Sequence, residues 1–534
     1  MQRTETDKFI KNEFFTVDEM FRGDARCRVE AETMLPDYKE SIGRILYTAA
    51  QIRIMKREAY KQGDLIVCSV AGECAFTTVY FTENGNADIS SYTYTSPFEH
   101  TFKGGNDIAS FDTDKMYIIT ETRSENVSCR LLGPRKMVFK ADAVIDAAIK
   151  ANRRISYYGA SSYPGYYART KSIRSSYMFS SAETDGIISE RIQLPKEYLP
   201  IGEILDCCAV VAASKAYTED DRINVEARAE LFCLYYPDSP NGEEKLPVSF
   251  RQPIDFSLSI TLDGCDPGDV SEAYLTCLGV KNMLDLDEYG ECRVINTEIG
   301  YYVNTRIIKN EEVSGVTDCY SSECILEADE KNILSETVLS SFTAEEEITL
   351  ELTPKREGFS EPGGAYIESE IKNCYTEKGE LYADMAIFVK YFGFNGEGNG
   401  IYDEEKCEYK ASISFPKELA GAILDEKRDI KIEISSEVLG ADISAENEKI
   451  TVRAQTVFFV SVCEKNESTV ISLISSLGER ADMGKGKKIV FYYPSSSESL
   501  WDVAKKYAVG CDTLRKMNPS ISEGAPLPRV INIM

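Results

Sequence analysis

Histidine is nearly missing from this chain of 534 residues, since His100 is its only one. Imidazole is the usual acid–base group near neutral pH and a frequent zinc ligand. The scarcity excludes a zinc site built from several histidines, and it makes any Ser-His-Asp relay depend on His100. That residue lies in the alternating segment Phe98-Glu99-His100-Thr101-Phe102. Such alternation predicts a solvated position on a β-strand rather than a catalytic one.

Long apolar stretches are missing as well. No run approaches the roughly 18 consecutive apolar residues of a membrane-spanning helix. The first nine residues also lack the apolar core and cleavage site of a secretory signal. We therefore expect a cytoplasmic protein without direct membrane insertion. The sixteen cysteines contain no Cys-x-x-Cys pair, so no metal site is predicted. In a reducing cytoplasm these cysteines are expected to remain thiols.

Positive charge is in short supply. Lys and Arg number 60 against 88 Asp and Glu, which leaves a net charge of −28. This balance argues against a nucleic-acid partner, because such proteins need a basic surface to displace counterions from phosphate. It also disfavours docking of the whole body on anionic lipid. No Gly-rich phosphate loop, catalytic carboxylate pair or Cys/His arrangement stands out, so we expect neither an enzyme nor a cofactor.

What is present is a repeated signature. Leu35-Pro36 is followed after five residues by Ile42-Gly43-Arg44-Ile45-Leu46. The same order returns at Leu194-Pro195 and Ile201-Gly202-Glu203-Ile204-Leu205, offset by 159 residues throughout. The segment 415–424, with Phe-Pro and Gly-Ala-Ile-Leu, is interpreted as a degraded third copy. Each intact copy leads into a strand, a polar turn and a longer strand, which predicts a chain of tandem modules.

The modules are expected to be rich in β-structure. Residues 223–232 and 450–459 alternate apolar and polar side chains with a period of two, as half-buried antiparallel strands do. We therefore predict a mainly β protein whose modules each pack two antiparallel layers over one core, as in a sandwich. The expected ranges are 1–182, 183–355 and, for a degenerate third repeat, 356–480. The tyrosine-rich stretch 157–167 breaks the alternation and is interpreted as a linker or a binding loop, with the linker favoured.

The composition changes near residue 484. Residues 484–534 hold eight basic and four acidic side chains, a charge of +4, so the first 483 residues carry −32. The segment predicts a strand over 488–493, a helix capped by Ser499 with Asp502 three residues on, a short helix over 512–517 and a closing strand over 527–533. This β-α-α-β order indicates a separate small domain, 484–534, with a partner of its own.

That domain resembles the LysM family. The family pattern is matched by Glu498-Ser499-Leu500-Trp501-Asp502-Val503-Ala504, by Tyr507, and by Leu514-Arg515-Lys516-Met517-Asn518-Pro519. The match departs at the serine run 495–497, where a glycine-containing turn is usual, and at Cys511, where threonine is common. Both positions lie near the groove that binds N-acetylglucosamine in sugar-binding members. The resemblance therefore implies a LysM fold and leaves glycan binding open.

Trp501, the only tryptophan, has two interpretations: it stacks on a sugar, or it packs in the domain core, which we favour. A domain of about 50 residues needs most of its apolar side chains for its own core. The predicted core residues are Leu500, Trp501, Val503, Ala504 and Leu514. A partner is then expected to contact an exposed rim, formed by Ser496, Ser497, Glu498, Lys505, Lys506, Lys516, Asn518, Ser520 and Glu523.

The body also resembles a known family. Its Leu-Pro-x5-Ile-Gly-x-Ile-Leu segments are similar to the SPOCS domain of clostridial spore proteins, and SPOCS repeats ahead of a terminal LysM domain are the arrangement of a family of spore-coat morphogenetic proteins. The resemblance implies a non-enzymatic adaptor in endospore coat assembly. In that family the LysM domain contacts the coat's structural ATPase at the forespore surface, in the mother-cell cytoplasm. The implied partner is that ATPase or another coat protein.

Two other functions compete with this one. A LysM domain also fits a protein that binds peptidoglycan, or other N-acetylglucosamine-containing glycan, in the cell wall or spore cortex. A wall hydrolase is the third candidate, and the lack of a recognisable catalytic pair disfavours it.

Overall fold

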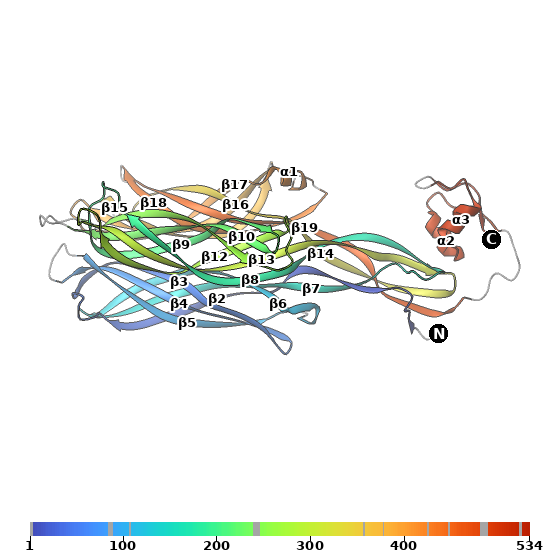
Figure 1. Cartoon of the computed structure of the whole chain (residues 1–534), viewed down its shortest axis with the longest axis horizontal. Coiled ribbons are helices and arrows are strands. Elements are labelled where there is room, and N and C mark those ends of the chain that lie inside the picture. The colour runs from blue at the N-terminus through green and yellow to red at the C-terminus, as the bar shows by residue number, and fades with distance from the viewer. Residues whose placement is uncertain are drawn as a thin grey trace.

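The computed structural model describes residues 4–83, 89–105, 108–238, 246–355, 358–377, 379–423, 425, 427–446, 449–480, 490–522 and 526–533. The fold is mainly β, as predicted, with long antiparallel strands that make the body elongated (Figure 1). Helices are few and short. Of those in the described part of the chain, none has the length and apolar character needed to cross a membrane.

The strands of the body form three repeats of six. The first repeat comprises β2 (Lys11–Met34), β3 (Ile42–Gln62), β4 (Leu65–Thr82), β5 (Ile89–Gly104), β6 (Phe111–Gly133) and β7 (Lys136–Tyr158), with a 3₁₀ turn at Ile108–Ser110. The second comprises β8 (Tyr166–Gln193), β9 (Ile201–Glu219), β10 (Arg222–Pro237), β11 (Val248–Thr261), β12 (Val270–Leu286) and β13 (Cys292–Ser321). The third comprises β14 (Cys324–Leu352), β15 (Phe359–Glu377), β16 (Glu380–Asn395), β17 (Gly400–Ile413), β18 (Asp429–Glu446) and β19 (Lys449–Glu479).

Every repeat has the same topology. Its second, third and fourth strands form one antiparallel sheet, and its first, sixth and fifth strands form another, as in β3-β4-β5 and β2-β7-β6. The two sheets face each other across a core: Phe76 of β4 stacks on Phe139 of β7, with ring centroids 5.0 Å apart. The short strand β1 (Thr4–Glu5) adds to β19 of the third repeat.

The alternation of apolar and polar residues in the sequence corresponds to the buried and exposed faces of the strands. On β10, Ile223, Val225 and Ala227 are buried in a repeat core, while the residues between them lie at or near the surface. On β19, Ile450 and Val452 follow the same rule. Side chains of a strand point to opposite faces in turn, so one face of each sheet is apolar.

The second and third repeats begin earlier in the chain than the ranges expected from the sequence. β8 passes through residue 182, and the third repeat starts at Cys324. The Leu-Pro signature in fact lies between the first and second strands of a repeat. The assignment of 415–424 as a third copy is wrong, because Lys417–Ile423 forms helix α1 between β17 and β18. The stretch 157–167 joins the end of β7 to the start of β8.

An arginine holds each intact Leu-Pro turn. The Arg135 guanidinium donates to the carbonyl oxygens of Pro36 (2.6 Å) and Lys39 (2.8 Å). Arg293 donates in the same way to the carbonyl oxygens of Tyr198 (2.6 Å) and Pro195 (3.4 Å). Buried or half-buried carbonyls need such donors, so each arginine fixes the path of the chain from the first strand to the second.

The three repeats surround a common axis. Their first strands β2, β8 and β14 contact one another, and so do their sixth strands β7, β13 and β19. Phe14, Ile173 and Ile333, which occupy equivalent places in β2, β8 and β14, pack into one cluster. The arrangement is therefore an approximate threefold one, built from a single chain.

Hydroxyl groups repeat around this axis. Ser175 Oγ donates to the carbonyl oxygen of Phe15 (2.8 Å), and Ser335 Oγ donates to that of Arg174 (2.8 Å). Thr16 Oγ1 in turn accepts from the backbone N–H of Glu336 (3.2 Å). Thr16, Ser175 and Ser335 are all buried, and each links its repeat to a neighbouring one.

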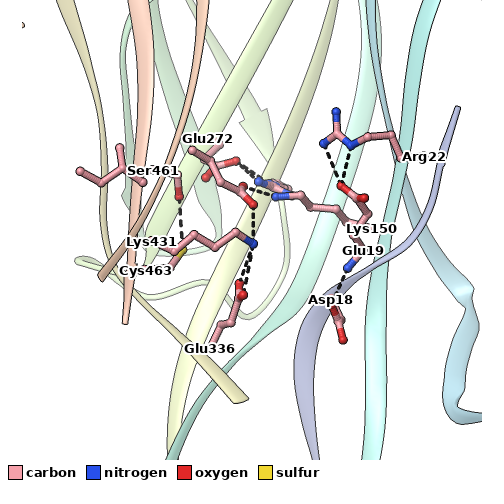
Figure 2. A network of polar contacts seen from close by, with 12 residues as sticks. Asp18, Glu19, Arg22, Lys150, Glu272, Glu336, Lys431, Ser461 and Cys463 are labelled. Atoms are coloured by element: carbon pink, nitrogen blue, oxygen red, sulfur yellow. Dashed lines mark hydrogen bonds and ion pairs between the residues drawn. The ribbon is translucent and has the colours of Figure 1, made fainter. Parts of the chain in front are cut away.

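An ion pair joins the first and third repeats a short distance from these hydroxyl groups (Figure 2). Lys150 of the first repeat pairs with Glu433 of the third, and Lys431 pairs with both Glu433 (2.9 Å) and Glu336 (3.1 Å). Burial alone would raise the pKa of Glu433, but the two lysines lower it to about 2. The carboxylate is thus ionised throughout the neutral range and fixes one repeat against another.

The C-terminal module, residues 490–533, has the predicted β-α-α-β order. It consists of β20 (Val490–Tyr492), α2 (Leu500–Tyr507), α3 (Cys511–Met517) and β21 (Ile531–Ile533), and β20 pairs with β21. Ser499 and Asp502 form the capping box at the start of α2: Ser499 Oγ accepts from the Asp502 N–H, and Asp502 Oδ2 accepts from the Ser499 N–H.

Candidate functional site on the C-terminal module

The C-terminal module lies beyond the ends of the long strands of the body (Figure 1). It contacts the last residues of β13 and the first residues of β8, which meet as neighbouring strands of one sheet. Tyr167 and Arg169 come from β8, and Asp318 and Tyr320 come from β13. These four side chains form a docking tip for the module.

Trp501 makes the central contact. Its indole N–H donates to Asp318 Oδ2 at 2.7 Å, the ring of Tyr320 meets it edge-on with centroids 4.9 Å apart, and the Arg169 guanidinium lies 5.3 Å from its ring centroid. The indole is half-buried. The body contacts both the N–H group and the apolar ring of the indole, which is typical of a tryptophan at an interface.

The body also completes the core of the module. Tyr320 is buried among Val503, Ala504 and Leu514, and its hydroxyl donates to the carbonyl oxygen of Val509 at 2.9 Å. Burial, with Cys511 close by, raises the pKa of this hydroxyl, which therefore remains protonated at neutral pH. Tyr167 stacks on Tyr320, with ring centroids 4.9 Å apart.

The predicted core residues divide into two sets. Val503, Ala504 and Leu514 are fully buried, together with Ile531 and Ile533 of β21. Leu500 and Trp501 are only partly buried. Both lie on α2, which faces the docking tip.

The predicted rim residues are in different environments. Ser496, Ser497, Lys506, Lys516 and Ser520 are exposed. The Lys505 ammonium is exposed too but pairs with Asp318 Oδ1 at 2.5 Å, so the docking tip occupies it. Glu498 Oε2 accepts from the Tyr492 hydroxyl (2.8 Å) and from the Ser495 N–H (2.8 Å). These hydrogen bonds, that of Tyr492 first, lower the pKa of Glu498.

Asn518 lies inside the module. Its amide nitrogen donates to the carbonyl oxygens of Leu514 (3.0 Å) and Asn532 (2.9 Å), and its amide oxygen accepts from the Asn532 N–H (2.8 Å). The side chain is buried and joins α3 to β21, so it offers nothing to a partner. Glu523 lies outside the described residues.

An exposed aromatic face was not predicted. Phe491 and Tyr493 alternate with Tyr492 and are 61% and 66% exposed, so they point away from the helices. Val530 lies beside β21 and is exposed as well. A two-stranded sheet covered by helices on one side only leaves its other face open. The sequence does contain an indication of this face, namely the continuous apolar run from 489 to 493. Successive side chains of a strand point to opposite faces, so half of the side chains in such a run point away from the module core.

The module presents basic and aromatic side chains at its surface. Within the described ranges, no group of three or more His, Cys, Asp or Glu side chains is placed to hold a metal ion. His100 is half-exposed on β5 and packs edge-on against Phe102, with centroids 4.5 Å apart. A basic, aromatic surface on a small module is suited to contact another macromolecule.

Comparison with known families matches one part of the body. Residues 200–283 match the family described as "SipL, SPOCS domain". This segment runs from β9 into β12 of the second repeat and contains the Ile201–Leu205 signature. The match supports a protein similar to SipL with respect to this domain, and suggests a role related to sporulation. No curated protein and no solved structure shows a significant match to the chain.

Proposed function

We propose that this protein is a non-enzymatic adaptor of endospore coat assembly. The observation that carries the proposal is the SPOCS match over 200–283, in the same repeat whose strands β8 and β13 hold the C-terminal module. The other two repeats share the topology of this one, so we infer that the body presents three SPOCS-like units. The protein would act in the mother-cell cytoplasm, at the forespore surface.

In this proposal the C-terminal module is a LysM domain that docks the coat's structural ATPase or another coat protein. The partner would approach the side that the body leaves open. Away from the docking tip, the module exposes Lys506 and Lys516 on its helices and the rings of Phe491 and Tyr493 on the open face of its sheet. The Lys506 ammonium also donates to the Tyr492 hydroxyl at 3.0 Å. Aromatic anchors beside basic groups fit an acidic protein surface that has an apolar patch.

The glycan-binding alternative has less support from the geometry. A sugar that stacked on Trp501 would have to displace Tyr320 and Arg169, and it would leave the Asp318 carboxylate without the indole N–H. Binding through Phe491 and Tyr493 is the remaining route for a glycan. Titration with N-acetylglucosamine oligomers separates the two functions.

The test is binding of the full chain to the purified coat ATPase. Lys506→Glu/Lys516→Glu should weaken binding more than about tenfold, because interface charge pairs of the kind proposed couple by about 1.5 kcal/mol or more. The matched control is Lys331→Glu/Lys417→Glu, which reverses two exposed lysines of the body. Equal loss in both double variants would show only a general charge effect and would contradict the proposed surface.

Location gives a second test. A fluorescent fusion in sporulating cells should form a shell around the forespore, and Lys506→Glu/Lys516→Glu should disperse it. Fluorescence in the outer wall, together with micromolar binding of N-acetylglucosamine oligomers by the purified chain, would support the glycan binder instead.

A further inference from the structure

Two cysteines face each other across neighbouring strands of the second repeat. Cys207 of β9 and Cys233 of β10 are direct partners in the antiparallel register of these strands. Directly opposite residues of such a pair have Cα atoms about 4.5–5.5 Å apart and side chains on the same face of the sheet. A disulfide joins Cα atoms about 4.4–6.8 Å apart. The backbone here therefore meets this requirement without movement.

The first repeat shows independently that side chains at this position touch. Thr48 is the equivalent of Cys207, because the two residues differ by the 159-residue offset of the repeated signature. Thr48 and Thr78 are partners in the register of β3 and β4, and their hydroxyl oxygens lie 2.9 Å apart. The two cysteines thus occupy the places of a pair whose Oγ atoms are in contact. Both also pack in the same core of the second repeat.

This pairing sets the two residues apart from the other cysteines. Along the described strands, no other two cysteines are partners in the register. Cys208, the next residue of β9, is opposite Phe232. Its side chain points to the other face of the sheet, since successive side chains of a strand alternate.

We propose that Cys207 and Cys233 are a modification site, at which a hydroperoxide oxidises the two thiols to a disulfide between β9 and β10. With hydrogen peroxide, the Cys207 sulfur attacks one oxygen and the O–O bond breaks. Cys207 becomes a sulfenic acid, and the leaving hydroxide takes up the thiol proton as water. The Cys233 sulfur then displaces the hydroxyl group from Cys207, which forms the S–S bond and releases a second water. Two thiols lose two electrons and two protons, and the peroxide is reduced to two waters.

Access and ionisation determine how fast this reaction runs. Cys207 is half-buried and lines a cavity of about 650 Å³ between the repeats, so a molecule as small as hydrogen peroxide reaches it. Cys233 is fully buried, and we expect it to react only with its neighbour. The interaction with Cys233, followed by burial, raises the pKa of the Cys207 thiol. Because the thiolate is the reactive form, oxidation should be slow at neutral pH and faster in alkali.

The disulfide would strengthen one repeat in particular. It closes a loop between β9 and β10, which restricts the unfolded chain and stabilises the fold. The second repeat also holds the C-terminal module, through β8 and β13. Oxidation would therefore make the attachment point of the module harder to unfold.

Peptide mass spectrometry of the full chain tests the proposal, after treatment with hydrogen peroxide in alkaline buffer and alkylation of the remaining thiols. We expect a linked pair of peptides that joins Cys207 to Cys233, and a rise in melting temperature that dithiothreitol reverses. Cys207→Thr/Cys233→Thr copies the pair of the first repeat, so it should fold and show neither effect. Cys208→Ser is the matched control and should keep both.

The reverse exchange tests the geometry itself. Thr48→Cys/Thr78→Cys should acquire a second disulfide, in the first repeat, under the same treatment.

Three outcomes would overturn the proposal. The first is no link between Cys207 and Cys233 while other thiols are oxidised. The second is a link from Cys207 or Cys208 to Cys277, which lines the same cavity. The third is conversion of Cys207 to a sulfinic acid while Cys233 is still alkylated after unfolding, since the two sulfur atoms would then not meet.

Discussion

The indole N–H of Trp501 donates to the carboxylate of Asp318, 2.7 Å away, across the junction between the C-terminal module and the body. The other oxygen of the same carboxylate accepts from Lys505. One aspartate of β13 thus holds two side chains of α2. A partner that binds through Trp501 or Lys505 must therefore compete with the body for that side chain. A partner that binds the side of the module away from the body does not compete with it.

The first prediction concerns this contact. Asp318→Asn should weaken docking of the module by about 1.5–3 kcal/mol, because two charge-assisted hydrogen bonds are lost. Trp501 is the only tryptophan of the chain, so its fluorescence reports on the junction directly. Its emission should move to longer wavelength as the indole gains water.

The matched control for that experiment is Asp512→Asn. Asp512 is an exposed aspartate of α3 that pairs with Arg515 at 3.2 Å. Its loss should leave the emission unchanged. If Asp318→Asn leaves the emission unchanged as well, the module does not rest on the body in solution.

The second prediction concerns the ion pairs between repeats. Glu433→Gln should destabilise the fold by about 3 kcal/mol, because it leaves Lys150 buried without its carboxylate. Denaturant unfolding measures this loss, and the exposed Glu330→Gln on β14, a strand of the same sheet, should change stability by less than about 0.5 kcal/mol.

The pH dependence of stability should test the same pair of Lys150 and Glu433. The pKa of Glu433 is about 2 in the fold and lies near its ordinary value of 4.5 in the unfolded chain. Its contribution is complete above pH 4.5 and is lost as the pH falls toward 2. The difference in stability between the original protein and Glu433→Gln should therefore shrink over that window. A difference that stays constant down to pH 2 would contradict the assigned pairing.

Much of the local structure could be predicted from the sequence. The Ser499–Asp502 spacing predicted the start of α2, and the alternation at 223–232 predicted β10, because both signals depend on residues close in the chain. The threefold arrangement could not be predicted. In the third repeat, Leu352 and Phe359 occupy the places of Leu35 and Ile42 but without the Pro and Gly of the signature.

The docking tip could not be predicted either. Asp318 and Tyr320 precede the C-terminal module by a whole repeat, and nothing in their local sequence distinguishes them from other strand residues. Trp501 was expected in the core because a small domain has few other apolar side chains. The structure shows that Tyr320 of the body fills part of that core and leaves the indole at the junction.

The third prediction concerns the Leu-Pro turns. Arg135→Lys should cost about 1–3 kcal/mol, because a lysine ammonium cannot span the carbonyl oxygens of Pro36 and Lys39 as the guanidinium fork does. Thermal unfolding measures the loss. Arg130→Lys, on the exposed side of β6, is the control and should have little effect. Equal melting of the two variants would show that the fork is dispensable.

The last prediction concerns the pH dependence that Glu437 imposes. Its pKa is raised from 4.5 to about 7 in the fold, first by burial and then by Glu121 and Glu368. Between these two values the unfolded chain ionises before the folded one, so stability falls as the pH rises from 4.5 to 7 and is level above that. Burial also raises the pKa of Glu121 and Asp206, which line the cavity between the repeats together with Glu437, so the whole protein should show this trend.

Glu437→Gln isolates the contribution of this one carboxyl group. The variant should melt at a higher temperature than the original protein at pH 8, where the ionised carboxylate is unfavourable, and at the same temperature near pH 4.5, where both side chains are neutral. If the two proteins melt together at every pH, the pKa of Glu437 is not raised in the folded protein.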